Sequence, residues 1–200
     1  MTTAMGAKRA ITRADILDPE LYARERRDLK RKITEVKKNR RVEVGPFATF
    51  YFENYETMWH QVHEMLHIER GGEAQIADEL AAYNPLIPQG DELIATVMFE
   101  IENPERRETM LAQLGGIEND IYLAVGGERT KGVPDPTREN TSPEGKASAV
   151  QFVRFPFTAK QKAAFRQANA EVLCGIDHLH YRHMAVMPET VRAALAEDFA

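Results

Sequence analysis

The sequence predicts an α+β protein: N-terminal helices, then a ferredoxin-like split βαββαβ sheet domain, then a C-terminal helix. Two observations carry this prediction. Through most of residues 1–90, apolar side chains recur at helical spacing. From residue 91 onward, two strand–helix–strand patterns follow one another, in the order typical of a split βαββαβ sheet. We therefore expect a helical region over 1–90 and a sheet domain over 91–200, which together can form one continuous fold.

Three helices and one hairpin are expected in the N-terminal region. Asp18 followed by Pro19 is a typical helix start, because Asp caps the first turn and Pro suits the first helical position. Asn54 can cap the second helix in the same way. The expected elements are helices over residues 19–39, 54–70 and 73–82 and a hairpin over residues 42–52.

In the sheet domain, strands are predicted from apolar alternation and helices from their caps. Asn103 precedes one helix, and Thr158 with Gln161 forms a capping box that begins the other. Because strand–helix–strand crossovers are right-handed, both helices are expected on one face of the sheet. The polar, Gly- and Pro-rich residues 126–148 are expected to be a surface loop, or else a lid or partner-binding loop. The expected strands are 93–101, 121–125, 150–157 and 172–176, and a C-terminal helix begins at Pro188.

Composition favours a folded protein of the cytoplasm. Hydrophobic residues make up 43% of the 200 residues and charged residues 28%, which excludes wholesale disorder. No apolar run approaches the roughly 20 residues needed to cross a bilayer, and no secretory signal is visible at the N-terminus. Cys174 is the single cysteine, so an internal disulfide is excluded. Its alternation with Val172 and Ile176 indicates a buried strand residue and not a nucleophile.

Positive charge is concentrated at the start of the chain, although the net charge of the whole chain is −5. Residues 1–41 contain 13 Lys and Arg but 6 Asp and Glu. A basic helix of this kind is a candidate binding surface for nucleic acid or an acidic partner, and Arg26, Lys30 and Arg31 would contribute to it. The alternative is a solvated helix face, since no aromatic residues are interleaved with the charges.

The second predicted helix carries the strongest chemical motif, an H-E-x-x-H pattern at His63, Glu64 and His67. On a helix this spacing places both imidazoles on one side, where they can bind zinc, with the Glu positioned to activate a zinc-bound water. His60 and Glu56 lie on the same strip of the helix as His63 and His67, so these four side chains can act together as metal ligands. This face is a candidate site for Zn or another divalent metal.

Several observations argue against a zinc peptidase. A catalytic zinc needs a third protein ligand, and no motif marks one. Glu79 and His178 are the later candidates. An E-x-x-H half-signature of di-iron bundles is also present at Glu64 and His67, but it has no second copy. The alternative to metal binding is a solvated polar face.

A second histidine cluster follows the last predicted strand. It consists of His178, His180 and His183, in residues expected to form a loop. If the fold brings this end of the sheet close to His60 or His63, the two clusters can form a composite metal site.

The sequence resembles the bacterial domain-of-unknown-function family 3501, most clearly in its central segment. The resemblance runs from about Ile11 to the C-terminus. The connector Tyr83 to Pro88 is its most specific part. The matching residues are Phe52-Glu53-Asn54, Thr57, Gln61, Glu64-Met65-Leu66, Ile68-Glu69-Arg70, Glu79-Leu80, Ala82-Tyr83-Asn84-Pro85-Leu86-Ile87-Pro88 and Thr96 to Ile101.

The resemblance implies no catalytic residues, because the family has no established activity. Its members are encoded beside rubrerythrin-like and iron–sulfur oxidoreductase proteins, which implies a link to redox or peroxide defence and makes such proteins candidate partners. At His63 and His67, relatives are expected to carry other polar residues such as Gln and Arg.

Three functional hypotheses follow. The first is an accessory protein of redox or peroxide defence that binds a divalent metal through the histidine face. The second is a zinc-dependent hydrolase in which Glu64 is the general base. The third is a binding module that uses the basic helix. A homodimer is compatible with all three.

Overall fold

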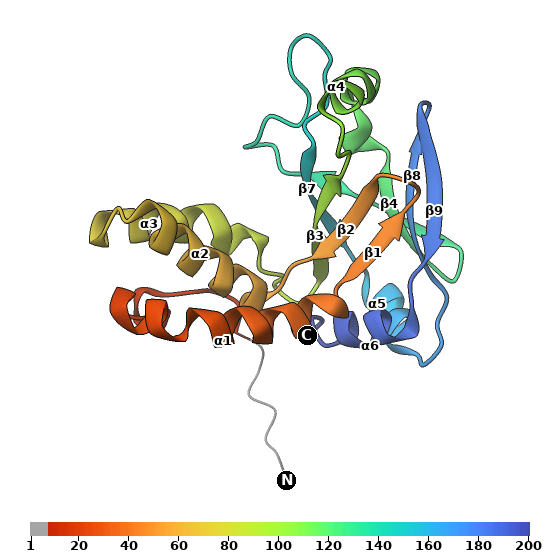
Figure 1. Cartoon of the computed structure of the whole chain (residues 1–200). Helices are drawn as coiled ribbons and strands as arrows, with labels where there is room; N and C mark the ends of the chain where they lie inside the picture. Colours follow the sequence, from red (N-terminus) through yellow and green to blue (C-terminus); the bar gives the residue numbers. More distant parts are fainter. Residues whose placement is uncertain (1–7) are drawn as a thin grey trace.

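The structure, a computed structural model, describes residues 8–200. This part of the chain consists of α-helices and antiparallel β-sheets (Figure 1). The α+β class is therefore confirmed. The three N-terminal α-helices project from one side of the sheets, the last two α-helices lie at their lower end, and the remaining α-helix lies at their upper end (Figure 1). Short 3-10 turns occupy Arg13–Asp15, Asn84–Leu86 and Ile117–Asn119.

The three N-terminal helices form at the predicted positions, and capping side chains begin the first two. The Asp18 carboxylate accepts from the N–H groups of Glu20 and Leu21. Asn54 accepts from the N–H of Thr57, and the Thr57 hydroxyl accepts from the N–H of Asn54 in return. These helices are α1 (Pro19–Lys38), α2 (Tyr55–Glu69) and α3 (Glu73–Tyr83).

The predicted hairpin over residues 42–52 is confirmed and joins a five-stranded sheet. Its two strands pair with each other and belong to this sheet, because β2 also pairs with β3, where Phe52 lies opposite Ala95. All neighbours are antiparallel, in the order β1-β2-β3-β7-β6. The strands are β1 (Arg41–Val44), β2 (Ala48–Phe52), β3 (Glu92–Phe99), β6 (Val133–Pro134) and β7 (Val150–Pro156).

A second sheet contains four strands in the order β5-β4-β8-β9, again antiparallel. The Tyr181 hydroxyl links this sheet to the first, since it accepts from the N–H of Ala48 at 2.9 Å and donates to the carbonyl of Val44 at 2.8 Å. The strands are β4 (Ile121–Val125), β5 (Glu128–Lys131), β8 (Val172–His178) and β9 (Tyr181–Val186).

The ferredoxin-like arrangement is not what these strands form. The four predicted strands are present as β3, β4, β7 and β8, but β3 pairs with β7 in one sheet and β4 pairs with β8 in the other. A single split βαββαβ sheet would place β8 beside β3. The hairpin strand β2 occupies that edge of β3 and so separates the two pairs.

The helices of the C-terminal half also differ from the expected layout. α4 (Pro104–Gln113) and α5 (Ala159–Arg166) lie at opposite ends of the sheets and not on one face (Figure 1). The Thr158–Gln161 capping box is present. Residues 126–148 are only partly a loop, because β5 and β6 fall within them. α6 (Glu189–Ala196) begins after Pro188 as predicted.

Two cores hold these elements together. The larger contains inward side chains of both sheets, among them the fully buried Phe50, Phe155 and Leu123. Burial of each such side chain stabilises the fold by roughly 1.5–3 kcal/mol. The smaller core joins α2 to the other face of the first sheet through Val62, Ile94 and their neighbours. This face is covered by α2 and the α3–β3 connector, and one of the cavities described below lies against it.

Within residues 8–200, no helix is both long and apolar enough to span a membrane.

Candidate functional site

The histidine face of α2 packs against α1 and the segment before it. His63 is 2% exposed. Its Nε2 accepts from the N–H of Leu17 at 3.0 Å, so the proton lies on Nδ1, which donates to the carbonyl of Trp59 at 2.7 Å. The ring also contacts Tyr22 and Trp59, with centroids 4.9 and 4.0 Å away. Burial lowers the pKa of His63. Both ring nitrogens are therefore engaged by the protein itself.

Glu64, the general base of the hydrolase hypothesis, is held by side chains of α1. Arg26 donates two hydrogen bonds of 2.8 Å to the two carboxylate oxygens, and the Tyr22 hydroxyl donates a third at 2.7 Å. Lys30 lies 3.1 Å from the same carboxylate. The Arg26 guanidinium in particular holds the pKa of Glu64 well below its usual range. This carboxylate joins two helices and has no free face for a metal-bound water.

The other residues of the strip do not complete a metal site. His60 is 8% exposed and its Nε2 has no hydrogen-bond partner among the described residues, whereas His67 is half-buried against Tyr22. Glu56 is exposed at the start of α2. Within residues 8–200, no three His, Cys, Asp or Glu side chains are grouped as metal ligands would be. Metal binding by this face stays a prediction.

The second histidine cluster lies on the β8–β9 hairpin, on the side of the sheets away from α2 (Figure 1). The rings of His178 and His180 are 5.8 Å apart, and the His183 ring packs on Tyr181. The fold does not bring these histidines to His60 or His63. Nearby in β8, Cys174 is fully buried, which raises the pKa of its thiol and agrees with the predicted core position.

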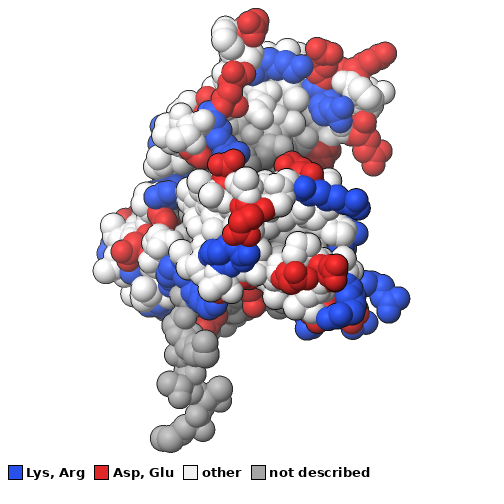
Figure 2. Space-filling model, turned by 90° about the vertical axis from the view of Figure 1, so that its left-hand side faces the viewer, with Lys and Arg blue, Asp and Glu red and all other residues white. Residues whose placement is uncertain are grey.

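The basic helix α1 does not present a uniform positive surface. Arg26 and Lys30 bind Glu64, while Arg31 pairs with Asp28. On the side of the molecule toward which the three helices project, Lys and Arg are interspersed with Asp and Glu (Figure 2).

A cavity of about 280 Å³ lies between α2, the α3–β3 connector and the outer face of the first sheet. We call it the Glu53 cavity. Aromatic and thioether side chains supply much of its wall, and the polar groups converge from β2, α2 and β3. The residues that define it here are Tyr51, Glu53, Tyr83, Thr96, Met98 and Phe152.

The Glu53 carboxylate lines this cavity and is 8% exposed. Its two oxygens accept from the hydroxyls of Thr57 at 2.6 Å and Thr96 at 2.7 Å. In the described part of the chain it forms no ion pair, and the nearby Arg40 donates to the Glu53 carbonyl instead. Glu53 lies between the end of β2 and the start of α2, because Asn54, the next residue, caps the helix. This position places the Glu53 carboxylate beside Thr57 in the first turn of α2.

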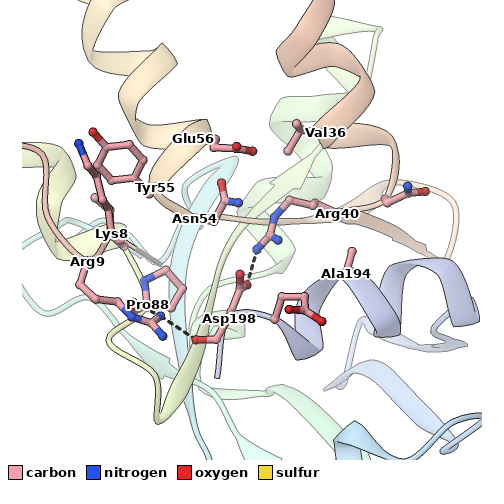
Figure 3. A pocket seen from close by; sticks show the side chains of 13 residues that line it. Lys8, Arg9, Val36, Arg40, Asn54, Tyr55, Glu56, Pro88, Ala194 and Asp198 are labelled. Carbon is pink, nitrogen blue, oxygen red and sulfur yellow. Dashed lines mark hydrogen bonds and ion pairs between the residues drawn. The ribbon is translucent and has the colours of Figure 1, made fainter. Parts of the chain in front are cut away.

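A larger cleft of about 570 Å³ lies at the foot of α1 and α2, bordered by α6 and the connector (Figure 3). We call it the foot cleft. At its floor Arg40, 5% exposed, forms an ion pair with Asp198. Arg9 donates to the carbonyls of Pro88 and Asp198 at 2.8 and 2.7 Å. Burial raises the pKa of Asp198, in opposition to the Arg40 charge.

Comparison with known proteins identifies the family. A family model described as "Protein of unknown function (DUF3501)" matches residues 10–199. The chain belongs to this family. A crystal structure of a protein of unknown function from Burkholderia pseudomallei is similar, with 38% identity and a TM-score of 0.88, over 96% of this chain and all of that one. The search of curated proteins found no match. The redox association and the rubrerythrin-like partners stay predictions.

Several of the segments that carry the family resemblance contribute residues to the Glu53 cavity, whereas those at Glu64–Leu66, Ile68–Arg70 and Glu79–Leu80 do not. Phe52-Glu53-Asn54, Thr57 and Gln61 supply one side, and the connector contributes Tyr83 and Leu86. Sequence reasoning quoted these residues for the resemblance and did not assign them to a site. One signal was available, because Thr49, Tyr51 and Glu53 alternate with buried Phe residues and so mark a polar face of β2.

Proposed function

We propose that the chain is a ligand-binding protein that holds a small amine or other cation in the Glu53 cavity. A single observation carries the proposal: a buried carboxylate at a cavity wall whose partners are two hydroxyls and no cation. An ionised carboxylate loses several kcal/mol of hydration on burial, which neutral donors offset only in part. It has roughly four lone-pair sites, and two hydroxyls occupy two of them.

The rest of the wall favours the same ligand. Tyr51, Tyr83 and Phe152 present aromatic rings, whose faces attract an ammonium group. Of the two cations that border the cavity, Arg40 is neutralised by Asp198 and Lys37 is exposed to solvent. A charge-assisted hydrogen bond from a ligand ammonium to Glu53 would contribute about 1.5–3 kcal/mol.

The competing explanation is a purely structural carboxylate. Glu53 links the first turn of α2 to β3 through Thr57 and Thr96, and this link alone can justify its position. A test must therefore remove the charge and keep the link. Glu53→Gln does so, because an amide retains an oxygen acceptor for one hydroxyl and its NH2 group can donate to the other.

The test compares benzylammonium, benzyl alcohol and benzoate as probes, by calorimetry and by backbone amide NMR shifts. The wild type should bind benzylammonium more tightly than the other two, with shifts at Thr57 and Thr96. Glu53→Gln should weaken benzylammonium about 10- to 100-fold, as loss of a charge-assisted hydrogen bond implies. Met98→Trp, which fills the cavity, should abolish binding of the probe.

Glu100→Gln is the matched control. Glu100 also accepts from two hydroxyls, those of Thr49 and Tyr51, but it is exposed and outside the cavity. It should leave binding unchanged. Equal affinity for benzylammonium and benzyl alcohol, or no binding of benzylammonium to the folded wild type, would contradict the proposal.

A further inference from the structure

The wall of the Glu53 cavity combines one carboxylate with a largely apolar lining. Within residues 8–200, Glu53 is the single Asp or Glu side chain that lines it. Six further side chains of the wall are aliphatic, thioether or aromatic: Met58, Leu86, Met98, Tyr51, Tyr83 and Phe152. A cationic ligand in this cavity therefore meets one anionic group and, on its other sides, mainly carbon and sulfur.

The hydroxyls beside Glu53 are already engaged by the protein. The Thr57 hydroxyl donates to Glu53 and accepts from the N–H of Asn54, and the Thr96 hydroxyl also donates to Glu53. Arg40, at the border of the cavity, is a donor and has no acceptor atom in its side chain. The Glu53 carboxylate is thus the main acceptor for a ligand, with two of its roughly four lone-pair sites unfilled.

Two of the three rings have no cation of the protein over them. The Arg138 guanidinium lies over the Phe152 ring, 4.2 Å from its centroid. In the described part of the chain, no Lys or Arg lies over Tyr51 or Tyr83 in this way. Aromatic faces attract a cation within about 6 Å of the ring centroid, and methylated ammonium groups are recognised by such rings.

The number of N–H groups on the ligand decides how well it fits this wall. A primary ammonium is compact and strongly hydrated and has three N–H donors, and each donor that finds no acceptor in the cavity loses a hydrogen bond. Methyl groups in place of two N–H groups remove this loss and add contacts with rings and thioethers. A quaternary ammonium retains the charge but has no N–H to donate to Glu53.

We propose that the ligand of the Glu53 cavity carries an N,N-dimethylated, tertiary ammonium group, an inference that rests on the proposed function and names the chemical class of its ligand. The one N–H of this group donates to Glu53. Its two methyl groups pack among Tyr51, Tyr83 and Met98.

The experiment measures, by calorimetry at pH 7, the affinity of the wild type for four cations that differ only in methylation. They are benzylammonium and its N-methyl, N,N-dimethyl and N,N,N-trimethyl derivatives. The dimethylated probe should bind at least about tenfold more tightly than benzylammonium, as added methyl groups in an apolar pocket imply. The trimethylated probe should bind at least about threefold more weakly than the dimethylated one, because it lacks the hydrogen bond to Glu53.

Ring variants test the contribution of the aromatic faces. Tyr51→Leu removes the ring, whereas Tyr51→Phe keeps it and loses only the hydroxyl, which donates to Glu100 outside the cavity. The dimethylated probe should bind about three- to thirtyfold more weakly to Tyr51→Leu than to Tyr51→Phe. Thermal melts check that both variants are folded. Tyr83→Leu beside Tyr83→Phe provides the same comparison on α3 if Tyr51→Leu does not fold.

Two results overturn this inference: benzylammonium binds as tightly as the dimethylated probe, or the trimethylated probe does. The proposed function survives either result as long as Glu53→Gln weakens benzylammonium. If Glu53→Gln leaves every affinity unchanged, the proposed function itself is contradicted. The number of methyl groups on the probe and the charge at residue 53 are varied separately, so the two proposals can be told apart.

Discussion

The α1–α2 contact and the Glu53 cavity each contain a glutamate held by short hydrogen bonds, but only the glutamate of the α1–α2 contact is paired with cationic side chains. Glu64 is bound by a guanidinium, an ammonium and a phenol, all supplied by α1. Glu53 is bound by two threonine hydroxyls and lines a cavity. The first carboxylate is neutralised within the protein, whereas the second has no cationic partner among the described residues. A metal-binding or catalytic motif in the sequence is therefore informative only when its partners in the fold are known.

The largest effect is expected from His63→Leu, which tests whether the α1–α2 contact is structural. The change leaves the N–H of Leu17 without its acceptor and removes a ring packed between Tyr22 and Trp59. We expect a loss of about 3 kcal/mol in the free energy of unfolding, measured by urea denaturation. A loss below about 0.5 kcal/mol would show that the contact is not important for stability.

The same variant should alter the pH dependence of stability. His63 has a lowered pKa in the fold, so its neutral form stabilises the native state above the unfolded value of about 6.5, and this contribution falls as the pH decreases. Between pH 7 and 5, the wild type should lose stability more steeply than His63→Leu, which can be followed by thermal melts.

Glu64→Gln should have a smaller effect, about 1–2 kcal/mol at pH 7, because it retains an oxygen acceptor but loses the charge that binds Arg26. The pKa of Glu64 is depressed in the fold, so its contribution is present above the unfolded value of about 4.3 and is lost as the pH falls further. The difference from wild type should therefore shrink below about pH 4. A difference independent of pH would exclude a role for the charge.

Glu53→Gln should change stability least, by under about 1 kcal/mol, while it weakens amine binding. The reason is that both threonine hydroxyls keep a partner. Urea denaturation of Glu53→Gln beside Glu64→Gln sharpens the comparison directly. A loss for Glu53→Gln equal to or above that for Glu64→Gln would indicate a structural carboxylate.

Zinc addition should leave the melting temperature unchanged. A zinc ion bound by the histidines of the H-E-x-x-H motif would have to displace the Leu17 N–H from His63. Glu64 would also have to leave Arg26 before it could act on a zinc-bound water. If zinc raises the melting temperature, and if replacement of His63 and His67 removes this effect, the metal hypothesis is correct and the contact rearranges.

Much of the local structure could be predicted from the sequence. Asp18, Asn54 and Thr158 begin helices at the expected positions, and the four central strands are within a few residues of their predicted bounds. Helix caps and strand alternation depend on neighbours within a few residues, so one sequence determines them. The strand β9 was missed because its residues alternate weakly, with only Tyr181 buried.

Only the tertiary structure decided how the strands pair and what the polar residues bind. Whether β2 or β8 lies beside β3 depends on residues far apart in the chain, and no local pattern records the choice. The same holds for the two glutamates. The sequence determined that Glu64 lies on a helix face with His63 and His67. It could not determine that α1 would bind Glu64 or that a cavity would lie beside Glu53, because both follow from long-range packing.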